Sequence, residues 1–514
     1  MKKTSSSDNL PEAKQNNRGR WQVNPYIWSF TTYFSEGFPY SIIRTISSVF
    51  CRDRGASLEA IGLTSLFGLP WTLKFLWAPQ LDEFATKRQW LLATQGLLAL
   101  LFLLTAFVVP LSWAIQAMAG LFMFGSFLAA THDTAIDGYY LEALDKEGQA
   151  RFVGYRVMAY RIALMTGTGV IVTIGTTLGW FPAFFLAGML MTGLFYFHVF
   201  YLPAVEKERK PFRTLLDSLL KLHFLTAAII LALLVISLRQ LLTSTWYLDL
   251  SKAHPVLDKF SFAGWIGILL FLSLILLALG RNKIKALILQ EPDSYYAKAF
   301  LTFMDRQGIG AIIAFIIFIR TGEFMLSTMV APFMVDLGVK IHYGWISGGV
   351  GLPCSIAGAM LGGRLISRYT LRRMIWPFLF AQNVTNIVYM VLALGMVDIL
   401  KINTGNSQPV AIGTVNLITV VAVHGFDQFA GGLGTAVLMT FLMRICSSEA
   451  KAAHYAIGTG LMSVSGLYAG VLSGFLASWL GYGYFFGVSF LLSIPGMLLV
   501  SYLPSAILEK QGTN

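Results

Sequence analysis

A succession of long apolar segments constrains this chain more than any other feature. A helix needs about 20 apolar residues to cross the ~30 Å hydrocarbon layer of a membrane, and these segments reach that length. Short polar stretches separate them, so the pattern predicts a series of membrane-spanning helices. The predicted spans are 26–49, 59–80, 90–110, 113–140, 152–178, 181–202, 223–243, 261–280, 308–335, 345–367, 374–397, 411–443, 452–479 and 482–503.

The composition argues against a soluble protein. Of the 514 residues, 56% are hydrophobic and 12% are charged. Soluble domains carry roughly 25% charged residues, and a single soluble core stops growing near ~250–300 residues. We therefore expect a polytopic protein surrounded by membrane lipid.

The positive charge is distributed as in a membrane protein. The net charge of +12 is spread over short polar breaks, so we expect no nucleic-acid partner. Lysine and arginine concentrate in alternate breaks, which predicts that both termini are cytoplasmic. The N-terminal stretch MKKTSSSDNLPEAKQNNRGR precedes no short apolar region with a cleavage site. We expect a flexible tail there and no removable signal peptide.

The spans fall into groups of six, two and six, and the outer groups resemble each other. FGLPWTLKFLWAPQLDEFATKRQW (67–90) aligns with VGLPCSIAGAMLGGRLISRYTLRR (350–373). Gly-Leu-Pro is common in membrane helices, so chance is one explanation, but the agreement in position favours a repeat. Two six-helix halves in the same orientation are the plan of major facilitator transporters. We predict an all-α major facilitator fold of two six-helix bundles plus two extra transmembrane helices between them. The predicted parts are a tail (1–22), an N-terminal bundle (23–203), a linker (204–222), the extra helices (223–280), a linker (281–306), a C-terminal bundle (307–504) and a tail (505–514).

Two carboxylates lie at the end of the fourth span, in AATHDTAIDGYYLEAL. A charge at the bilayer centre costs roughly 2.5–3.5 kcal/mol on insertion scales, so it needs a partner or a polar cavity. Asp133 and Asp137 are four residues apart and share a helix face. In an antiparallel pair with the next helix, Asp137 lies level with Arg156, and Asp133 lies level with Arg161. We predict a structural charge lock between Asp137 and Arg156. For Asp133, beside His132, a lock and a proton or substrate role remain open.

Other charged residues fall within or next to the predicted spans. Lys74 can extend along apolar surface to the interface or point into a cavity, and we favour the cavity. Asp82, in the turn before the third span, is expected to hold cytoplasmic helix ends together. Arg320 and Glu323 can pair along one helix, yet their depth makes Glu323 a candidate for protonation. Glu36 lies at a comparable place in the first span.

A further polar group lies in the stretch HGFDQFAGGLG. Asp427 is costly in lipid and therefore predicts a polar lumen. The glycines beside it permit a kink or close helix packing, which is the structural alternative. Gln382, Asn383 and Asn386 either bond a hydroxylated ligand or hold helices together.

No pattern indicates an enzyme. The sequence has no P-loop, so we expect no direct use of ATP. It also lacks GxSxG, HExxH and clustered zinc ligands. Cys51, Cys354 and Cys446 are far apart, which favours neither a disulfide framework nor a metal site. We expect no cofactor.

Several stretches in combination resemble the AmpG-type muropeptide permeases. They are KFLWAPQLD (74–82), RQWLLATQ (88–95), THDTAIDGYY, Tyr-Arg at 160–161 and DQFAGGLGTA (427–436). The resemblance runs from about Thr31 to Pro504. It implies proton-driven import of N-acetylglucosamine–anhydro-N-acetylmuramic acid and its peptides across the bacterial inner membrane for cell-wall recycling. A weaker resemblance extends to acetyl-coenzyme A transporters.

Position by position, much of the family pattern is present. The matching residues are Lys74, Asp82, Asp133, Asp137, Arg161, Gln382, Asn386, Gly431 and Gly432. Glu323 and Asp427 fall where the family accepts either acid. Glu36 departs from the pattern, because a small residue is expected there. The turn after Asp82 is also shorter and less basic.

The cargo implied by the resemblance is large, anionic and rich in hydroxyls, so it would need cations, amides and aromatic faces. The cavity candidates are Arg44, Lys74, His132, Arg161, Arg320, Gln382, Asn386, Gln428 and Trp71. The proton-coupling candidates are Asp133, Glu323, Asp427 and Glu36, and the charge-lock candidates are Asp82, Asp137 and Arg156.

A facilitator for another cargo, such as acetyl-coenzyme A, a siderophore or a drug, is the alternative function, and a receptor or scaffold is a third possibility. The intramembrane acids argue against the third. We expect a monomer.

Overall fold

A computed structural model describes most of the chain. It covers residues 24–508 apart from 75–76, 79–80, 82–83, 145, 205–210, 212–232, 234–235, 255–256, 258–261, 281–282, 284–285, 287–294, 406–411 and 447–450. Every regular element in this described part is a helix. The predicted tail 1–22, nearly all of the predicted linker 204–222 and the predicted lock residue Asp82 lie outside the described residues.

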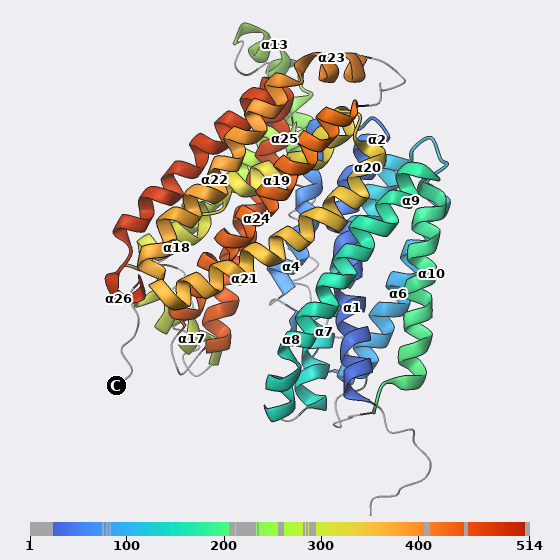
Figure 1. The fold of residues 1–514 in the computed structure, drawn as a ribbon, viewed down its shortest axis with the longest axis vertical. Helices are drawn as coiled ribbons and strands as arrows, with labels where there is room; N and C mark the ends of the chain where they lie inside the picture. The colour runs from blue at the N-terminus through green and yellow to red at the C-terminus, as the bar shows by residue number, and fades with distance from the viewer. Residues whose placement is uncertain are drawn as a thin grey trace, which may run out of the picture.

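The N-terminal half consists of helix runs that coincide with the first predicted spans (Figure 1). Three runs contain a π-helical or 3-10 segment, labelled η, that the sequence pattern did not predict. The runs are α1 (Pro25–Ser41) with η1 (Ile42–Ile46) and α2 (Ser47–Asp53); α3 (Leu58–Leu63) with η2 (Thr64–Gly68) and α4 (Leu69–Leu73); α6 (Lys87–Val108); α7 (Ala114–Ala143); α8 (Lys146–Met165) with η4 (Thr166–Ile171) and α9 (Val172–Thr177); and α10 (Trp180–Tyr201).

Local chemistry explains several of these helix starts. The Asn24 side chain accepts a hydrogen bond from the Tyr26 N–H at 3.0 Å, and Pro25 occupies the first helical position, where its missing N–H costs nothing. Thr86 and Gln89 form a reciprocal capping box at the start of α6. Gly179, with φ of 105°, makes the turn before α10 that residues with a side chain rarely adopt.

The C-terminal half repeats this organisation. Its long runs are α18 (Ile309–Phe318) with α19 (Thr321–Asp336); α20 (Lys340–Trp345) with η5 (Ile346–Gly351) and α21 (Leu352–Tyr369); α22 (Leu371–Gly395); α24 (Thr414–Arg444); and α25 (Lys451–Leu498). Gly481, with φ of 71°, divides α25 into two helices, between the predicted spans 452–479 and 482–503. Shorter elements are α17 (Tyr295–Met304), α23 (Val397–Gly405), η6 (Leu499–Tyr502) and α26 (Ser505–Leu508).

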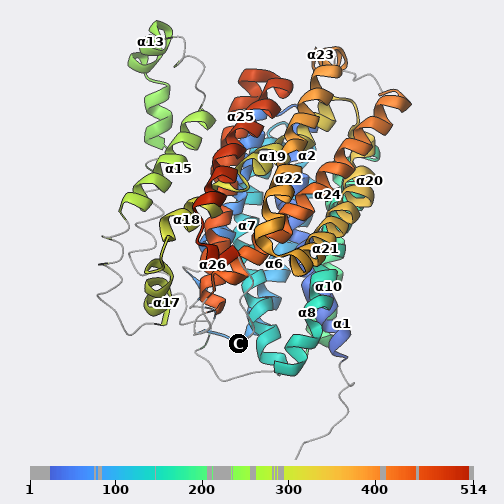
Figure 2. The same cartoon turned by 60° about the vertical axis from the view of Figure 1, so that its left-hand side comes forward.

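The insertion between the halves stands outside both bundles. Its best-described helices are α13 (Thr245–Ala253) and α15 (Phe262–Leu279). Figure 2 shows α15 beside α25 and α18, whereas α13 stands apart from them. At Gly267 a Cβ would come within 2.7 Å of Leu472, so α15 packs closely on α25. Among the described residues, nine helices or helix runs are long and apolar enough to cross a membrane. One of them, Ile457–Tyr502, contains the turn at Gly481 and so holds two of the predicted spans.

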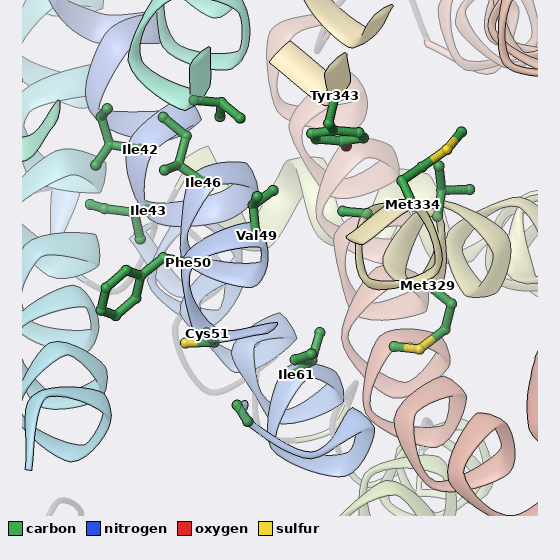
Figure 3. Close-up of a cluster of buried hydrophobic side chains, with 14 of the residues drawn as sticks. Ile42, Ile43, Ile46, Val49, Phe50, Cys51, Ile61, Met329, Met334 and Tyr343 are labelled. Carbon is green, nitrogen blue, oxygen red and sulfur yellow. The ribbon is translucent and has the colours of Figure 1, made fainter. Parts of the chain in front are cut away.

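The apolar core joins the two halves at one end of the molecule. We call this the far end; it carries α2, α9 and α20 and lies opposite the start of α1 (Figure 1). One buried cluster there includes Ile46 and Phe50 of the N-terminal half together with Met329, Met334 and Tyr343 of the C-terminal half. Figure 3 shows these side chains on neighbouring helices of the two halves.

At the opposite end, which we call the terminal end, the described residues form two separate cores. One contains Trp28, Trp90 and Tyr139, and all its members belong to the N-terminal half. The other contains Phe315 and Phe441, and its members belong to the C-terminal half and its flanking helices. The halves therefore share a core at the far end and keep separate cores at the terminal end.

Candidate functional site

An ion pair between α4 and α7 forms the centre of the polar cluster in the N-terminal half. Lys74 Nζ lies 2.6 Å from Asp133 Oδ2, with side chains 34% and 12% exposed. Trp77 Nε1 donates to Thr131 Oγ1 at 3.1 Å, so the chain after Lys74 is attached to α7. The sequence places Asp133 level with Arg161, whereas the structure pairs it with Lys74 from the second span.

Glu36 of α1 adds a carboxylate to this cluster. Its Oε2 atom is buried and has no hydrogen-bond partner among the described residues. The charges that act on Glu36 are those of Asp133, Asp137 and Lys74. Three carboxylates thus lie close to a single lysine, and like charges at such short range repel each other.

The predicted contact between Asp137 and Arg156 forms, and a tyrosine mediates it. Tyr33 donates a hydrogen bond to Asp137 Oδ1 at 2.8 Å, and Arg156 Nη1 donates to the Tyr33 hydroxyl at 2.8 Å. Arg156 Nη1 lies 3.4 Å from Asp137 Oδ1. The guanidinium carbon also lies 5.2 Å from the ring centroids of Tyr33 and Tyr140. These contacts join α1, α7 and α8.

His132 does not fit the cavity role predicted for it. Its side chain is fully buried. Ring atom Nε2 lies 3.3 Å from Ser35 Oγ, and Nδ1 lies 3.0 Å from Thr94 Oγ1. Both ring nitrogens therefore have protein partners, and the residue joins α1, α6 and α7 instead of facing a ligand. The motif did not reveal this, because adjacent residues of one helix face different surroundings.

A second charged cluster lies in the C-terminal half. Arg320, at the start of α19, donates from two nitrogens to both carboxylate oxygens of Glu323. Gln382 Nε2 from α22 donates to the same carboxylate. The Arg320 guanidinium carbon lies 5.1 Å from the Phe324 ring centroid. The predicted pairing along the helix is present, and Gln382 extends it to a second helix.

The glycines of the GGLG stretch make room for this cluster. A Cβ at Gly434 would overlap Gln382 Oε1, and a Cβ at Gly432 would overlap the carbonyl oxygen of Ser355. Helix α24 can therefore lie directly against α22 and α21.

Asp427 lies on the same helix as these glycines. It is buried, and Gln428 Nε2 is 3.3 Å from its Oδ2 atom. The charge of Glu323 acts on Asp427, so the two acids belong to one electrostatic group. The neighbouring His424 places Nδ1 3.0 Å from the Tyr389 hydroxyl.

Asn386 also departs from the cavity role predicted for it. The side chain is fully buried, accepts a hydrogen bond from Ser489 Oγ at 2.5 Å and donates to the Asn383 carbonyl oxygen at 3.0 Å. It holds α22 against α25, which is the structural alternative that the sequence left open.

The remaining cavity candidates are half-buried. Arg44, in η1, donates to the Ser65 carbonyl oxygen at 2.8 Å. Gly68 leaves space for this guanidinium, because a Cβ there would lie 3.0 Å from Arg44 Cζ. The Trp71 ring packs edge-on against Tyr40 with centroids 5.2 Å apart. Arg161 lies on α8.

Sequence reasoning missed two ion pairs that connect the halves at the far end. Arg52 of α2 pairs with Asp336 of α19, and Lys340 of α20 pairs with Asp53 of α2. A repeated Asp-x-Gly, at 53–55 and 336–338, was the available signal.

The predicted site residues lie outside the cavity in the insertion, and the described part of the chain contains no candidate metal site. A cavity of about 530 Å³ lies in the insertion, lined by Arg239, Tyr247, Ser251 and Phe262, and contains none of them. No group of three or more His, Cys, Asp or Glu side chains that could hold a metal ion occurs in the described part of the chain.

Relatives with known names identify the group to which this chain is similar. An Escherichia coli (strain K12) protein named anhydromuropeptide permease is 23% identical over 474 residues, which is 91% of this chain and 77% of the relative. A Rickettsia conorii protein assigned provisionally as transporter AmpG 4 is 20% identical over 483 residues, which is 92% of this chain and 94% of the relative. Over most of its length the chain is therefore similar to AmpG-type transporters. No protein-family model matches it.

Solved structures show the fold of this chain. A peptide transporter of the POT family superimposes with a TM-score of 0.60 at 14% identity, covering 94% of both chains. A nucleoside transporter superimposes with a TM-score of 0.53 at 12% identity, covering 94% of this chain and 100% of the other. The predicted all-α major facilitator fold is confirmed, and the chain is a multi-pass membrane protein.

Proposed function

We propose that this protein is a proton-coupled secondary transporter that imports anhydromuropeptides into the cytoplasm by alternating access. The observation that carries the mechanism is the arrangement of the cores. A shared core closes the halves together at the far end, while each half keeps its own core at the terminal end. Rocking of residues 23–203 against 307–504 would exchange these arrangements. The anhydromuropeptide permease of E. coli supports the cargo.

The orientation follows from the distribution of lysine and arginine. With both termini cytoplasmic, in the bacterial inner membrane, the far end faces outward and the terminal end faces the cytoplasm. The structure then represents a conformation closed to the outside. The insertion packs through α15 mainly on α25 of the C-terminal half and also touches α3 of the N-terminal half, so rocking of the monomer would change the contact between α15 and α3.

Lys74 is the cation that we assign to the cargo. Its side chain is one-third exposed, and among the described residues it forms an ion pair with Asp133. A carboxylate of the cargo must therefore compete with Asp133 for the ammonium group. Arg44, Arg161 and Arg320 are further candidates for anionic groups, and Trp71 and Gln428 for the sugar rings and hydroxyls.

Proton coupling follows from the crowding of acids around Lys74. A proton bound by Asp133 or Glu36 would remove one negative charge and weaken the hold on Lys74. Lys74 would then be free to bind the cargo, so proton and cargo would bind together. Glu323 and Asp427 offer the same arrangement in the C-terminal half, with Arg320 as the cation. Asp137 and Arg156 remain the proposed structural lock.

Uptake of labelled anhydromuropeptide into oriented vesicles tests this proposal. We expect accumulation when the outside is more acidic than the inside, and loss of accumulation when a protonophore removes the gradient. Asp249→Asn is the matched control, because Asp249 is an exposed acid on α13 and, among the described residues, pairs with Lys252 of its own helix. Equal rates with and without the gradient would refute proton coupling. Transport of acetyl-coenzyme A, a siderophore or a drug in place of the muropeptide would refute the cargo.

A further inference from the structure

The two halves end their first helix runs in the same way at the far end. Gly55 has φ of 81° and Gly338 has φ of 83°, the left-handed conformation that favours glycine. The Ala56 N–H bonds to the Cys51 carbonyl at 2.9 Å, and the Val339 N–H bonds to the Met334 carbonyl at 3.0 Å. Each bond spans five residues, as in a Schellman helix end. Asp53 and Asp336 precede the glycines by two residues, so they occupy equivalent positions.

Each of these equivalent aspartates binds a cation from the opposite half. Arg52 Nε donates to Asp336 Oδ1 at 2.6 Å, and its Nη2 contacts Oδ2, which makes the contact bidentate. Lys340 Nζ contacts Asp53 Oδ1. The two ion pairs are therefore reciprocal, with one carboxylate and one cation from each half.

A neighbour in its own half holds each aspartate in place. Trp180 Nε1 donates to Asp53 Oδ2 at 2.6 Å, and the Tyr482 hydroxyl donates to Asp336 Oδ2 at 2.7 Å. Both aromatic side chains are buried. Since each carboxylate keeps its own anchor, separation of the halves would break the contacts to the cations and leave the carboxylates oriented.

Close glycine contacts also join the two halves. A Cβ at Gly62 would lie 2.9 Å from Gly474 Cα, and a Cβ at Gly348 would lie 2.8 Å from Gly169 Cα. Each contact joins helices of opposite halves. The backbones meet directly, so the far end can open only if the halves move apart.

The four charges are partly withdrawn from water in this closed arrangement. The Asp336 and Asp53 side chains are 8% and 12% exposed. Removing one partner leaves the other charge uncompensated while the end stays closed. Opening would return that charge to water, so loss of one partner favours the open arrangement.

We propose that Arg52, Asp53, Asp336 and Lys340 form a latch that holds the far end closed and must open once in each transport cycle. The inference rests on the alternating-access mechanism proposed above. The four are positioning residues that set the balance between the two conformations and do not contact the cargo.

Thiol labelling measures the latch directly. The reporter is Ser65→Cys, in a variant whose Cys51, Cys354 and Cys446 are replaced by serine. Ser65 is buried against Gly470 of the other half, so a cysteine there reacts only when the far end opens. An impermeant maleimide is applied separately to each face of the vesicles, without cargo.

Single charge changes should open the latch and a swap should close it again. We expect Arg52→Asp or Asp336→Arg to raise the labelling rate roughly 10-fold or more from the outer face, and the double variant to return it toward the parent rate. Asp336→Asn and Lys340→Gln change fewer atoms and should raise the rate in the same direction. Asp249→Arg breaks an exposed ion pair within α13 and should leave the rate unchanged.

Labelling at the parent rate in all single variants, or no restoration in the swapped double variant, would overturn the latch. Because no cargo is present, these outcomes are independent of the proposed function. A protein that transports no muropeptide but shows the labelling changes keeps the latch. A protein that transports muropeptide with unchanged labelling lacks it.

Discussion

Replacing Asp133 with asparagine should separate cargo binding from proton coupling. In the parent protein the carboxylate of Asp133 lies 2.6 Å from Lys74 Nζ, and a cargo anion must displace it. Asparagine keeps the size of the side chain and removes the charge. Lys74 is then available at every pH, so we expect tighter binding and lost accumulation in the same variant.

The structure sets the size of the effect. Exposed ion pairs contribute about 0.2–1 kcal/mol, and breaking a buried pair costs about 3–5 kcal/mol. With exposures of 34% and 12%, this pair lies between those limits. We therefore assume that the cargo must overcome about 2 kcal/mol to separate Lys74 from Asp133. Removal of this cost corresponds to roughly 30-fold tighter binding of the cargo.

Two measurements test this prediction. Equilibrium binding of labelled anhydromuropeptide to purified protein should strengthen as the pH falls in the parent and should depend much less on pH in Asp133→Asn. Uptake driven by a pH gradient should be lost in the same variant.

Asp137→Asn is the control on the same helix. Arg156 bonds mainly to the Tyr33 hydroxyl there, so the pH dependence of binding should persist. Weaker binding by Asp133→Asn with an unchanged pH dependence would show that Asp133 does not compete with the cargo for Lys74.

Two further variants test the cluster in the C-terminal half. In Gly434→Ala the new methyl group overlaps Gln382 Oε1, so thermal unfolding in detergent should occur at a lower temperature, whereas Gly413→Ala, with open space around it, should not change it. Equal unfolding temperatures for the two would contradict the packing described for α22 and α24. Glu323→Gln leaves Arg320 without its carboxylate, and we expect about 2–4 kcal/mol of lost stability, measured by denaturant unfolding. A loss below about 0.5 kcal/mol would mean that Arg320 finds water or another partner.

Partners between neighbouring helices could be predicted where a short turn sets the register. Asp137 and Arg156 lie on consecutive helices joined by a turn, so counting residues from that turn placed them at the same height. The same counting failed for Asp133, because its partner Lys74 comes from a helix two spans earlier. Rotation and tilt between non-consecutive helices are set by packing, and the sequence carries no simple period for them.

The sequence pattern also did not predict which polar side chains bond to neighbouring helices inside the bundle. His132 and Asp133 are adjacent, yet one contacts Ser35 and Thr94 inside the bundle and the other contacts Lys74. Successive residues point about 100° apart around a helix, so polarity at one position says little about its neighbour. Asn386 and Gln382, one turn apart, likewise bond to different helices.

The sequence by itself determined that the chain folds into a series of long apolar helices. Transfer of a helix into lipid is a sum over its own residues, so about 20 consecutive side chains contain that information. The tertiary structure decided which charges meet. The contact between Arg52 and Asp336 joins residues 284 positions apart, and such a pair depends on a distance of a few ångströms that only the packing of two complete halves creates.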